Sequence, residues 1–558
     1  MDIQISTVLV IQIIAMSLAG IPIIASFFKH RLEAVLLLSV LCLSIVFGGL
    51  YFPSLLELTY KAVPNLGWCI SKLQAYDELL VSSWQSFSSW FTFVFASTVV
   101  WCAFVSLRII EGRSNVIRGT KLLTFDQMKS EIKKYGWPKL PVNIGQFIVP
   151  ESLISRSWVL IGEPGTGKTL MILRFIISYF KRGEVFFCVD IGADIFRKMG
   201  KEEDILIAPT YENSQIWSPF SEIYSSSDCK ALASMMIDKS PGESGSWDEK
   251  AIDYTADLLY FCKKEKRATN GDLTYFVRLA PLEELKEIFH GTSTMRLFES
   301  GSEKMLSNVQ SIVSQNLSFF DVLEPSAGDD SFSFRKWVRE RKTNLWLIND
   351  ESSQEVTLPL RRVGISLIIR ESLSLGEDRS RRINVILDEL PANGRIATLQ
   401  NALAQGRKFG LNFLLGFQSL PLLYSVYGRD VAQAILGSAG HCVVLRTPDV
   451  ESAEYFSGTI GSSVTERESV SVSKPNNSVT KQKVRENQRT VTPEDIQSLK
   501  DLNGYIKISS IGWSKIKVPI VNVDNKNHLE PKVINDIEEL DSLPAPKNPI
   551  KTKSLDDI

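Results

Sequence analysis

The chain has 558 residues, of which 44% are hydrophobic and 22% charged, and a length this great excludes a single compact core, so several domains are expected. The formal net charge of −1 excludes a basic field over the whole protein, so any nucleic-acid binding must depend on local patches. Seven scattered cysteines without a CxxC pair, and only four histidines, argue against a zinc site or a disulfide framework and favour buried, reduced thiols.

Three uncharged, mostly apolar stretches come first, at about 4–28, 34–53 and 87–107, and each is long enough to cross a bilayer. Basic residues follow the first stretch and the third, and basic flanks stay on the cytoplasmic side. The pattern therefore predicts three spans, an outside N-terminus and a cytoplasmic body after Leu107. If the second stretch does not span, two spans with an inside N-terminus remain. Buried core helices are a further alternative, poorly suited to the aromatic-rich third stretch.

A phosphate-binding loop is predicted next, between an apolar strand at 158–161 and an apolar helical run from Leu170. It matches the pattern G-x-x-x-x-G-K-[ST] at every fixed position, with Gly162, Glu163, Pro164, Gly165, Thr166, Gly167, Lys168 and Thr169. Glycines let several backbone N–H groups point at phosphate oxygens, and the following helix presents its positive N-terminal end. We therefore expect ATP and Mg²⁺ as cofactors, with Lys168 on the phosphates and the Thr169 hydroxyl on the metal ion.

Further strands are predicted at 184–190 and 204–209, followed by a long helical region. Asp190 ends the first of these strands, where a structural role is favoured over one near the nucleotide. From 228 to 323, apolar residues recur at three- and four-residue spacing, as in amphipathic helices. A basic cluster at 263–267 is interpreted as a solvated helix end, with a DNA contact as the minority alternative.

The second half of an ATPase site is predicted where the β-branched strand 382–387 ends in Asp388 and Glu389. Asp388 is expected to hold Mg²⁺ mainly through water, and Glu389 to orient or deprotonate the attacking water. Lys168 and Asp388 are 220 positions apart, whereas a βα unit needs only about 30 residues. The sequence therefore predicts an α/β nucleotide-binding domain with an all-α domain inserted into it.

Two more site residues are predicted around the strand 411–417. Gln418 at its end places an amide near the γ-phosphate and is a candidate sensor of hydrolysis. Arg407, before the strand, is a candidate arginine finger that acts on the neighbouring subunit's nucleotide. From the residues alone, a surface arginine in a glycine-bounded turn is an equally good interpretation of Arg407.

Several motifs in chain order resemble those of one family. They are 118–122 (RGTKL), 217–220 (WSPF), 388–391 (DELP), 405–410 (QGRKFG), 416–419 (GFQS), 427–428 (YG), 446–449 (RTPD) and 491–499. Over roughly residues 80–520, the chain resembles the TraD/TrwB-type coupling proteins of bacterial conjugation and type IV secretion, within the FtsK/HerA-like P-loop ATPases. That order makes the resemblance more specific than any single motif.

The resemblance implies a RecA-like fold with a mainly parallel central sheet, and a DNA-stimulated ATPase anchored in the bacterial inner membrane with its ATPase domain in the cytoplasm. It implies a homo-hexamer, with single- or double-stranded DNA, the relaxase and relaxosome, and type IV secretion channel proteins as partners. It also places Arg407 and Gln418 on the family's finger and sensor positions. Two departures are the three membrane spans, where two are usual, and the short tail.

The expected domains are a transmembrane region at 1–110, a nucleotide-binding domain in two parts at 111–224 and 326–523, an all-α domain at 225–325 and a polar tail at 524–558. Residues 462–488 suggest an exposed hairpin or loop, and the composition of the tail suggests disorder. Alternative functions are a chromosome or cell-division DNA pump, and a nucleotide-gated receptor of a secretion system that does not pump DNA. A membrane ATP-dependent protease is a third, although the metalloprotease motif HExxH is missing from the sequence.

Overall fold

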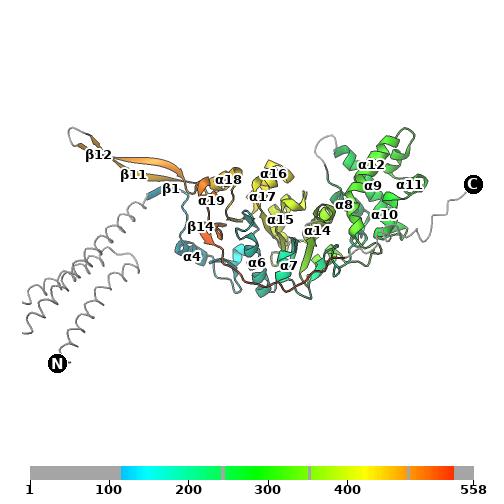
Figure 1. The fold of residues 1–558 in the computed structure, drawn as a ribbon, viewed down its shortest axis with the longest axis horizontal. Coiled ribbons are helices and arrows are strands. Elements are labelled where there is room, and N and C mark those ends of the chain that lie inside the picture. The colour runs from blue at the N-terminus through cyan, green and yellow to red at the C-terminus, as the bar shows by residue number, and fades with distance from the viewer. Residues whose placement is uncertain (1–114, 240–244, 350–352, 474–477, 533–558) are drawn as a thin grey trace, which may run out of the picture. The chain divides into compact units, whose positions relative to one another are not determined.

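The computed structural model describes residues 115–239, 245–349, 353–473 and 478–532 (Figure 1). The stretches predicted to span the membrane, at about 4–28, 34–53 and 87–107, lie outside these residues. Within the described part of the chain, no helix is both long enough and apolar enough to cross a bilayer. The chain divides between Asn115 and Val116, and apart from Asn115, the first residue of β1, the elements below belong to the second unit.

A nine-stranded sheet organises this unit. Seven neighbouring strands, from β10 to β6, are parallel, and an antiparallel pair, β13 and β14, completes one edge. In spatial order the strands are β14 (Gly512–Lys517), β13 (Asn503–Ile508), β10 (His441–Val444), β4 (Trp158–Ile161), β9 (Leu411–Phe417), β8 (Ile383–Leu387), β5 (Phe186–Ile191), β7 (Leu345–Asn349) and β6 (Ile205–Ile207). The predicted α/β fold with a mainly parallel central sheet is confirmed.

Helices cover both faces of the sheet, which explains why its strands are continuous apolar runs (Figure 1). Trp158 and Leu160 of β4 pack in one core, while Val159 and Ile161 pack in the other. The first core contains α4 (Phe125–Lys134), α6 (Lys168–Arg182) and α7 (Asp194–Met199). The second contains α14 (Gln354–Ser374), α15 (Leu399–Gln405), α16 (Leu420–Tyr427), α17 (Arg429–Ser438) and α18 (Val450–Ile460).

Smaller elements complete the described fold. A short antiparallel pair of strands, β2 (Val142–Ile144) and β3 (Phe147–Val149), comes before β4 in the sequence and is followed by the short helix α5 (Glu151–Ile154). Another short helix, α19 (Pro493–Gln497), comes before β13.

The described residues between β6 and β7 form helices and contain no strand. In order they are η1 (Pro219–Glu222), α8 (Ser226–Met236), α9 (Gly245–Lys264), α10 (Asn270–Arg278), α11 (Leu282–Phe289), η2 (Ser293–Phe298), α12 (Glu303–Asn316), η3 (Ser318–Val322) and α13 (Phe334–Glu340). The long helix α9 packs in the middle, with Leu258 and Leu259 fully buried. We call residues 226–322 the helical segment.

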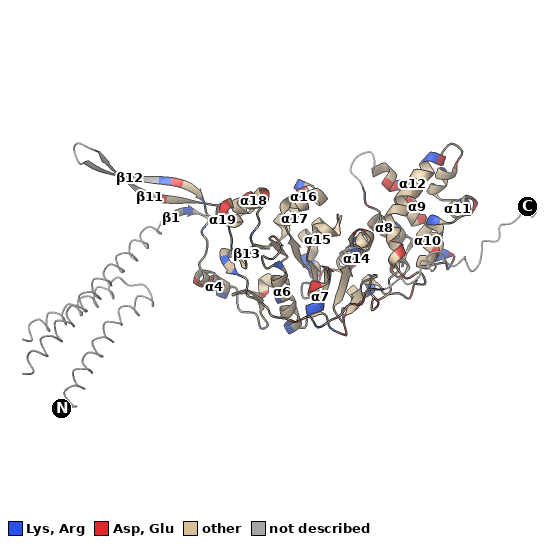
Figure 2. Cartoon of the chain, in the orientation of Figure 1, with Lys and Arg blue, Asp and Glu red and all other residues tan. Residues whose placement is uncertain are grey.

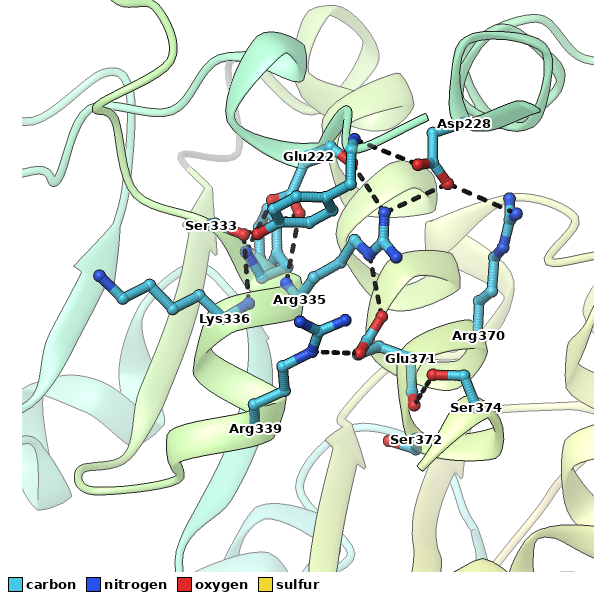
Figure 3. Close-up of polar contacts among 12 residues, drawn as sticks. Glu222, Asp228, Ser333, Arg335, Lys336, Arg339, Arg370, Glu371, Ser372 and Ser374 are labelled. Atoms are coloured by element: carbon cyan, nitrogen blue, oxygen red, sulfur yellow. Dashed lines mark hydrogen bonds and ion pairs between the residues drawn. The ribbon is translucent and has the colours of Figure 1, made fainter. Parts of the chain in front are cut away.

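A network of charged groups joins the start of the helical segment and the helix α13 that follows it to α14 (Figure 3). The Arg335 guanidinium contacts Glu371 at 2.8 Å and Asp228 at 3.2 Å, so it links α13, α14 and α8. Arg339 occupies the other oxygen of Glu371 at 2.6 Å. Glu222, fully buried in η1, accepts hydrogen bonds from the Ser333 hydroxyl and two backbone N–H groups at the start of α13. Each buried carboxylate is therefore paired or hydrogen-bonded, as its burial requires.

The basic cluster at 263–267 contributes two residues to packing. Lys263 Nζ pairs with Asp329 at 2.6 Å and donates to the Phe220 carbonyl at 3.0 Å. The Arg267 guanidinium lies 4.2 Å from the centroid of the Phe276 ring. Lys264 and Lys266 are exposed, as the interpretation of a solvated helix end predicts.

The hairpin predicted near residues 462–488 is confirmed, as β11 (Ser462–Ser473) and β12 (Ser478–Arg489), with β1 (Asn115–Gly119) beside β11. The prediction of a disordered tail is wrong for residues 524–532. There Lys526 N–H donates to the Arg197 carbonyl at 2.8 Å, and Lys532 N–H to the Thr210 carbonyl at 2.8 Å. The composition of this segment hid the packing, because the backbone makes most of these bonds. Residues 533–558 lie outside the described residues.

His441 is a fully buried histidine at the start of β10, stacked on Trp158 with 4.1 Å between the ring centroids. Its Nδ1 accepts from the Ser509 N–H at 3.1 Å, so Nε2 carries the proton and donates to the Leu153 carbonyl at 2.9 Å. Burial lowers the pKa of His441 to about 4. The folded chain therefore holds this histidine neutral.

Stability should fall as the pH drops from 6.5 towards 4, in part because of His441. In that range the unfolded chain binds a proton at this histidine and the folded chain does not, which costs ~2 kcal/mol at pH 5. In His441→Gln, which keeps a neutral polar side chain, the difference in melting temperature between pH 7 and pH 5 should shrink. An unchanged difference would contradict the buried neutral assignment.

Candidate nucleotide-binding site

The predicted phosphate-binding loop lies between β4 and α6, at the carboxyl edge of the parallel strands. Gly167 has φ 113°, a left-handed conformation that favours glycine, and it caps the N-terminus of α6. The Thr166 hydroxyl donates to the Glu163 carbonyl at 2.7 Å, which closes the loop on itself. The free N–H groups of the first turn of α6 therefore lie beside the loop, where they favour an anion.

Lys168 begins α6, and the residue is only 9% exposed. Its Nζ donates to the Gly162 carbonyl, so the ammonium group turns back over the loop. Burial lowers the pKa of Lys168, while the charges of Glu389, Asp388 and Glu163 act in the opposite direction. The structure thus brings the loop lysine near both acids, although they are 220 positions away in the sequence.

Asp388 and Glu389 follow β8, which is separated from β4 by β9 alone. All three strands are parallel, so their carboxyl ends meet at one edge. Burial raises the pKa of Asp388 to about 6 and that of Glu389 to about 7, and the positive charge of Lys168 opposes both shifts. One carboxylate oxygen of Glu389, Oε1, is buried and has no hydrogen-bond partner among the described residues. An acceptor in this state can take a hydrogen bond from a bound water.

Gln418 directly follows β9 and makes side-chain and backbone hydrogen bonds to Glu389, so the candidate sensor lies beside the acidic pair. The two strands approach closely here. A Cβ atom on Gly416 would lie 2.1 Å from the Asp388 carbonyl oxygen, so this position of β9 admits only glycine. The Leu390 N–H donates to the Gly416 carbonyl at 2.7 Å, which fixes the chain after the acidic pair.

The remaining residues of the loop differ in exposure. Thr169, in the first turn of α6, is half-buried, while Pro164 and Gly165 are exposed. Within the described residues, no three His, Cys, Asp or Glu side chains are grouped closely enough to hold a metal ion by themselves.

Arg407 lies at the opposite edge of the sheet, in η6 (Gly406–Phe409) before β9. Its guanidinium contacts the Ser155 hydroxyl at 3.2 Å and the Ser152 carbonyl at 3.4 Å, both before β4. Because β9 has seven residues and is roughly 20 Å long, Arg407 does not reach the loop of its own chain. Burial, followed by the charges of Arg156, Arg379 and Arg382, lowers its pKa.

Asp190 is the penultimate residue of β5, the strand next to β8, and it is fully buried. Its Oδ2 accepts from the N–H groups of Ile195 at 2.9 Å and Phe196 at 2.8 Å, at the start of α7. This contact agrees with the structural role that the sequence favoured.

The sequence did not indicate that Arg446 and Leu502 contact the phosphate-binding loop, an arrangement that we call the clasp. Arg446, after β10, pairs with Glu163 of the loop and with Asp501 at 2.7 Å. Leu502 has φ 62°, unusual for a residue with a branched side chain, and its N–H donates to the Thr166 carbonyl at 3.2 Å. In the sequence, Arg446 was noticeable only as part of the RTPD motif, and nothing in the sequence indicated a contact of Leu502 with the loop.

Residues 141–519 match the family profile described as the type IV secretion-system coupling protein DNA-binding domain. The chain belongs to the type IV secretion-system coupling protein family. The resemblance inferred from the motifs is therefore confirmed.

Relatives and solved structures agree with this membership. The chain is 25% identical over 496 residues to coupling protein TraD of Escherichia coli K12, an alignment that covers 85% of this chain and 68% of TraD. The plasmid coupling protein TrwB in complex with the ATP analogue ADPNP has a TM-score of 0.67 at 24% identity, over 75% of this chain and 98% of TrwB. A TrwB structure with ADP and Mg²⁺ has a TM-score of 0.66 at 24% identity, over 74% and 96%. The TrwB likeness shows a shared fold.

Proposed function

We propose that this chain is a membrane-anchored, ATP-driven motor that couples relaxase-bound DNA to a type IV secretion channel during bacterial conjugation. The observation that carries the proposal is the meeting of Lys168, the Asp388–Glu389 pair and Gln418 at one sheet edge, beside a phosphate-binding loop. A P-loop ATPase needs this set of groups around its phosphates. Family membership supplies the biological setting, because the family is that of secretion-system coupling proteins.

The residues present fit ATP and Mg²⁺. Gly162–Thr169 would hold the phosphates, and the Thr169 hydroxyl and Asp388, mainly through water, would hold the metal ion. Mg²⁺ suits such a site because it keeps several waters and takes ligands from substrate phosphates. When bound, it would supply positive charge against the phosphate oxygens. The TrwB complexes with ADPNP and with ADP and Mg²⁺ support this assignment.

Glu389 is the proposed base for the attacking water. Its buried Oε1 has no hydrogen-bond partner in the described part of the chain, so it can accept the water's proton, while Gln418 holds the rest of the side chain in place. Lys168 would contact the β- and γ-phosphates, and its positive charge would favour the ionised forms of the two acids. The geometry thus supports hydrolysis in addition to nucleotide binding.

Arg407 is proposed to act on the neighbouring subunit's nucleotide, because it lies at the wrong edge of the sheet for its own. Arg407→Ala should lower ATP hydrolysis about 100-fold, as the loss of one transition-state donor does, without weakening nucleotide binding to the same chain. Lys408→Ala, next to it and 3.8 Å from Glu377, is the matched control and should keep its rate.

Mixed assemblies separate action on the neighbour from action within one chain. Lys168→Ala subunits retain Arg407, and Arg407→Ala subunits retain an intact loop, so a mixture should recover part of the activity that each variant lacks. A mixture as inactive as its components would contradict action on the neighbour.

The proposed assembly is a homo-hexamer in the bacterial inner membrane. It would be anchored by three spans, at about 4–28, 34–53 and 87–107, with the nucleotide site in the cytoplasm, and its partners would be DNA, the relaxase and the channel proteins. Figure 2 shows acidic and basic residues interspersed along the labelled elements. Because no single basic face stands out there, we expect local groups of basic residues to hold the DNA through its phosphate backbone.

The test of this function is the ATPase rate of the full chain in a membrane mimic, with and without single- and double-stranded DNA. We expect the rate to rise with DNA and this stimulation to fall steeply with salt. A confirmed oligomer whose rate of ATP hydrolysis is the same with and without every DNA tested would contradict the proposed motor function. Loss of plasmid transfer in a Lys168→Ala strain would connect hydrolysis to conjugation.

A protein receptor is the second candidate function. An open hollow of about 650 Å³ lies on the helical segment, lined by Phe276, Arg278 and Leu285 and by the serines and glutamines of α12, and it could seat a protein substrate. Measuring transfer of plasmid DNA and of effector proteins in the same Lys168→Ala strain separates the two functions. Loss of protein transfer alone would favour the receptor.

A further inference from the structure

Helix α14 carries two adjacent arginines that are almost completely buried. Arg361 is 1% exposed and Arg362 5% exposed. Buried arginines are rare, and each must find acceptors for its donors. The two residues find different ones, and these contacts give them different roles.

Arg361 binds groups at the carboxyl edge of the sheet. Its Nη2 donates to the Ala392 carbonyl at 2.9 Å and to the Gln354 carbonyl at 3.1 Å. Arg361 Nη1 lies beside the side-chain amide of Asn349, at the end of β7, and the amide orientation that satisfies both residues turns the Asn349 oxygen to accept from this group. One guanidinium thus joins the end of β7, the start of α14 and the turn that follows the acidic pair.

That turn fixes the backbone of Glu389. It continues from Glu389 into η5 (Pro391–Asn393), and the Asn393 side chain donates to the Glu389 carbonyl at 2.8 Å. Asn393 itself is fully buried. Among the residues that the structure describes, the Glu389 carboxylate is hydrogen-bonded to Gln418 and its Oε1 has no partner, so the position of the carboxylate depends strongly on this backbone.

We propose that Arg361 is a positioning residue that holds the 389–394 turn, and with it the Glu389 carboxylate, for hydrolysis. The inference rests on the proposed ATPase function and concerns how the base of that site is held. Arginine suits the role because its planar group presents donors in several directions at once. A lysine has one compact head and cannot reproduce contacts to two carbonyls and an amide.

Arg362 is a control provided by the fold. It is buried on the same helix, but its Nη2 donates to the Met236 carbonyl at 2.8 Å and its Nη1 pairs with Asp238 at 2.7 Å. These partners belong to the end of α8 and the residues just after it. Its Cγ and Cδ atoms also lie beside Gly394, at the end of the 389–394 turn, and glutamine keeps both atoms. Arg362→Gln should therefore destabilise the fold without moving the acidic pair.

The experiment compares the full-length wild type with Arg361→Gln, Arg361→Lys and Arg362→Gln in a membrane mimic. We measure kcat and KM for Mg·ATP, the Kd of Mg·ADP by calorimetry, and the melting temperature. Arg361→Gln should lower kcat at least about tenfold, because small displacements of a catalytic group cost this much or more. Its Kd should stay within about threefold, since the loop is untouched, and Arg361→Lys should not restore kcat.

Arg362→Gln should lower the melting temperature and keep kcat within about twofold of the wild type. If kcat instead falls in both variants in proportion to the melting temperature, or survives in Arg361→Gln, the inference is wrong. Should Arg361→Gln fail to fold, Asn393→Ala loosens the same turn with a smaller change and must also lower kcat. A wild-type chain that binds Mg·ADP and never hydrolyses ATP would instead refute the proposed function, and this inference with it.

Discussion

Replacing Lys168 with alanine is expected to lower ATP hydrolysis by about 1,000-fold or more, to below detection in most assays. The substitution removes the cation that contacts the Gly162 carbonyl of the loop and whose charge acts on both acids. It deletes a charged contact to the transferring phosphate and also the charge that favours the ionised forms of Asp388 and Glu389. Binding of Mg·ATP should weaken as well. The measurement is the steady-state rate and the nucleotide Kd of the purified full chain.

Lys181→Ala is the matched control for this prediction. Lys181 lies in the last turn of the same helix, α6, and is exposed. Lys181→Ala should keep the wild-type rate of hydrolysis and the wild-type Kd. The comparison therefore distinguishes the loss of the Lys168 ammonium group from a general disturbance of helix α6. If Lys168→Ala retains a tenth of the activity, the site is misassigned.

Glu389→Gln should separate binding from turnover. The amide keeps the size of the side chain but cannot accept a proton from water, so kcat should fall about 1,000-fold while Mg·ATP still binds. Asp388→Asn should mainly weaken the Mg²⁺-dependent binding of ATP, because Asp388 is the proposed metal ligand. Single-turnover hydrolysis, measured alongside the nucleotide Kd, distinguishes the two patterns.

Equal loss of Mg·ATP binding in both variants would contradict the separate roles of Asp388 as metal ligand and Glu389 as base. Substantial hydrolysis by Glu389→Gln would remove Glu389 from the role of base. Either result would leave the fold intact and change the mechanism.

The strands around the site could be predicted because their chemistry is local. Residues 158–161 and 383–387 are buried on both faces and are continuous apolar runs, and the loop and acidic pair follow them directly. The placement of Gln418 beside the acidic pair was also predicted, on a strand next to the one that ends in Asp388 and Glu389. The full order of the nine strands could not be predicted, because it depends on contacts between segments far apart in the chain.

Helix α14 shows why other parts could not be predicted. A helix that is buried on nearly all sides has no polar face, so its sequence lacks the amphipathic period that marks a surface helix. Its arginines, Arg361 and Arg362, suggest solvent exposure, yet both are buried by contacts with carbonyl groups elsewhere in the chain. The clasp of Arg446 and Leu502 over the phosphate loop likewise arises only from the folded arrangement.

The most direct test of the central claim is a structure of the full chain determined with ADPNP and Mg²⁺. The account predicts the triphosphate within the N–H groups of residues 162–169, the metal ion between Thr169 and Asp388, and Glu389 facing the γ-phosphate. A nucleotide bound elsewhere, or an acidic pair too far from the loop for a metal ion to lie between them, would contradict it.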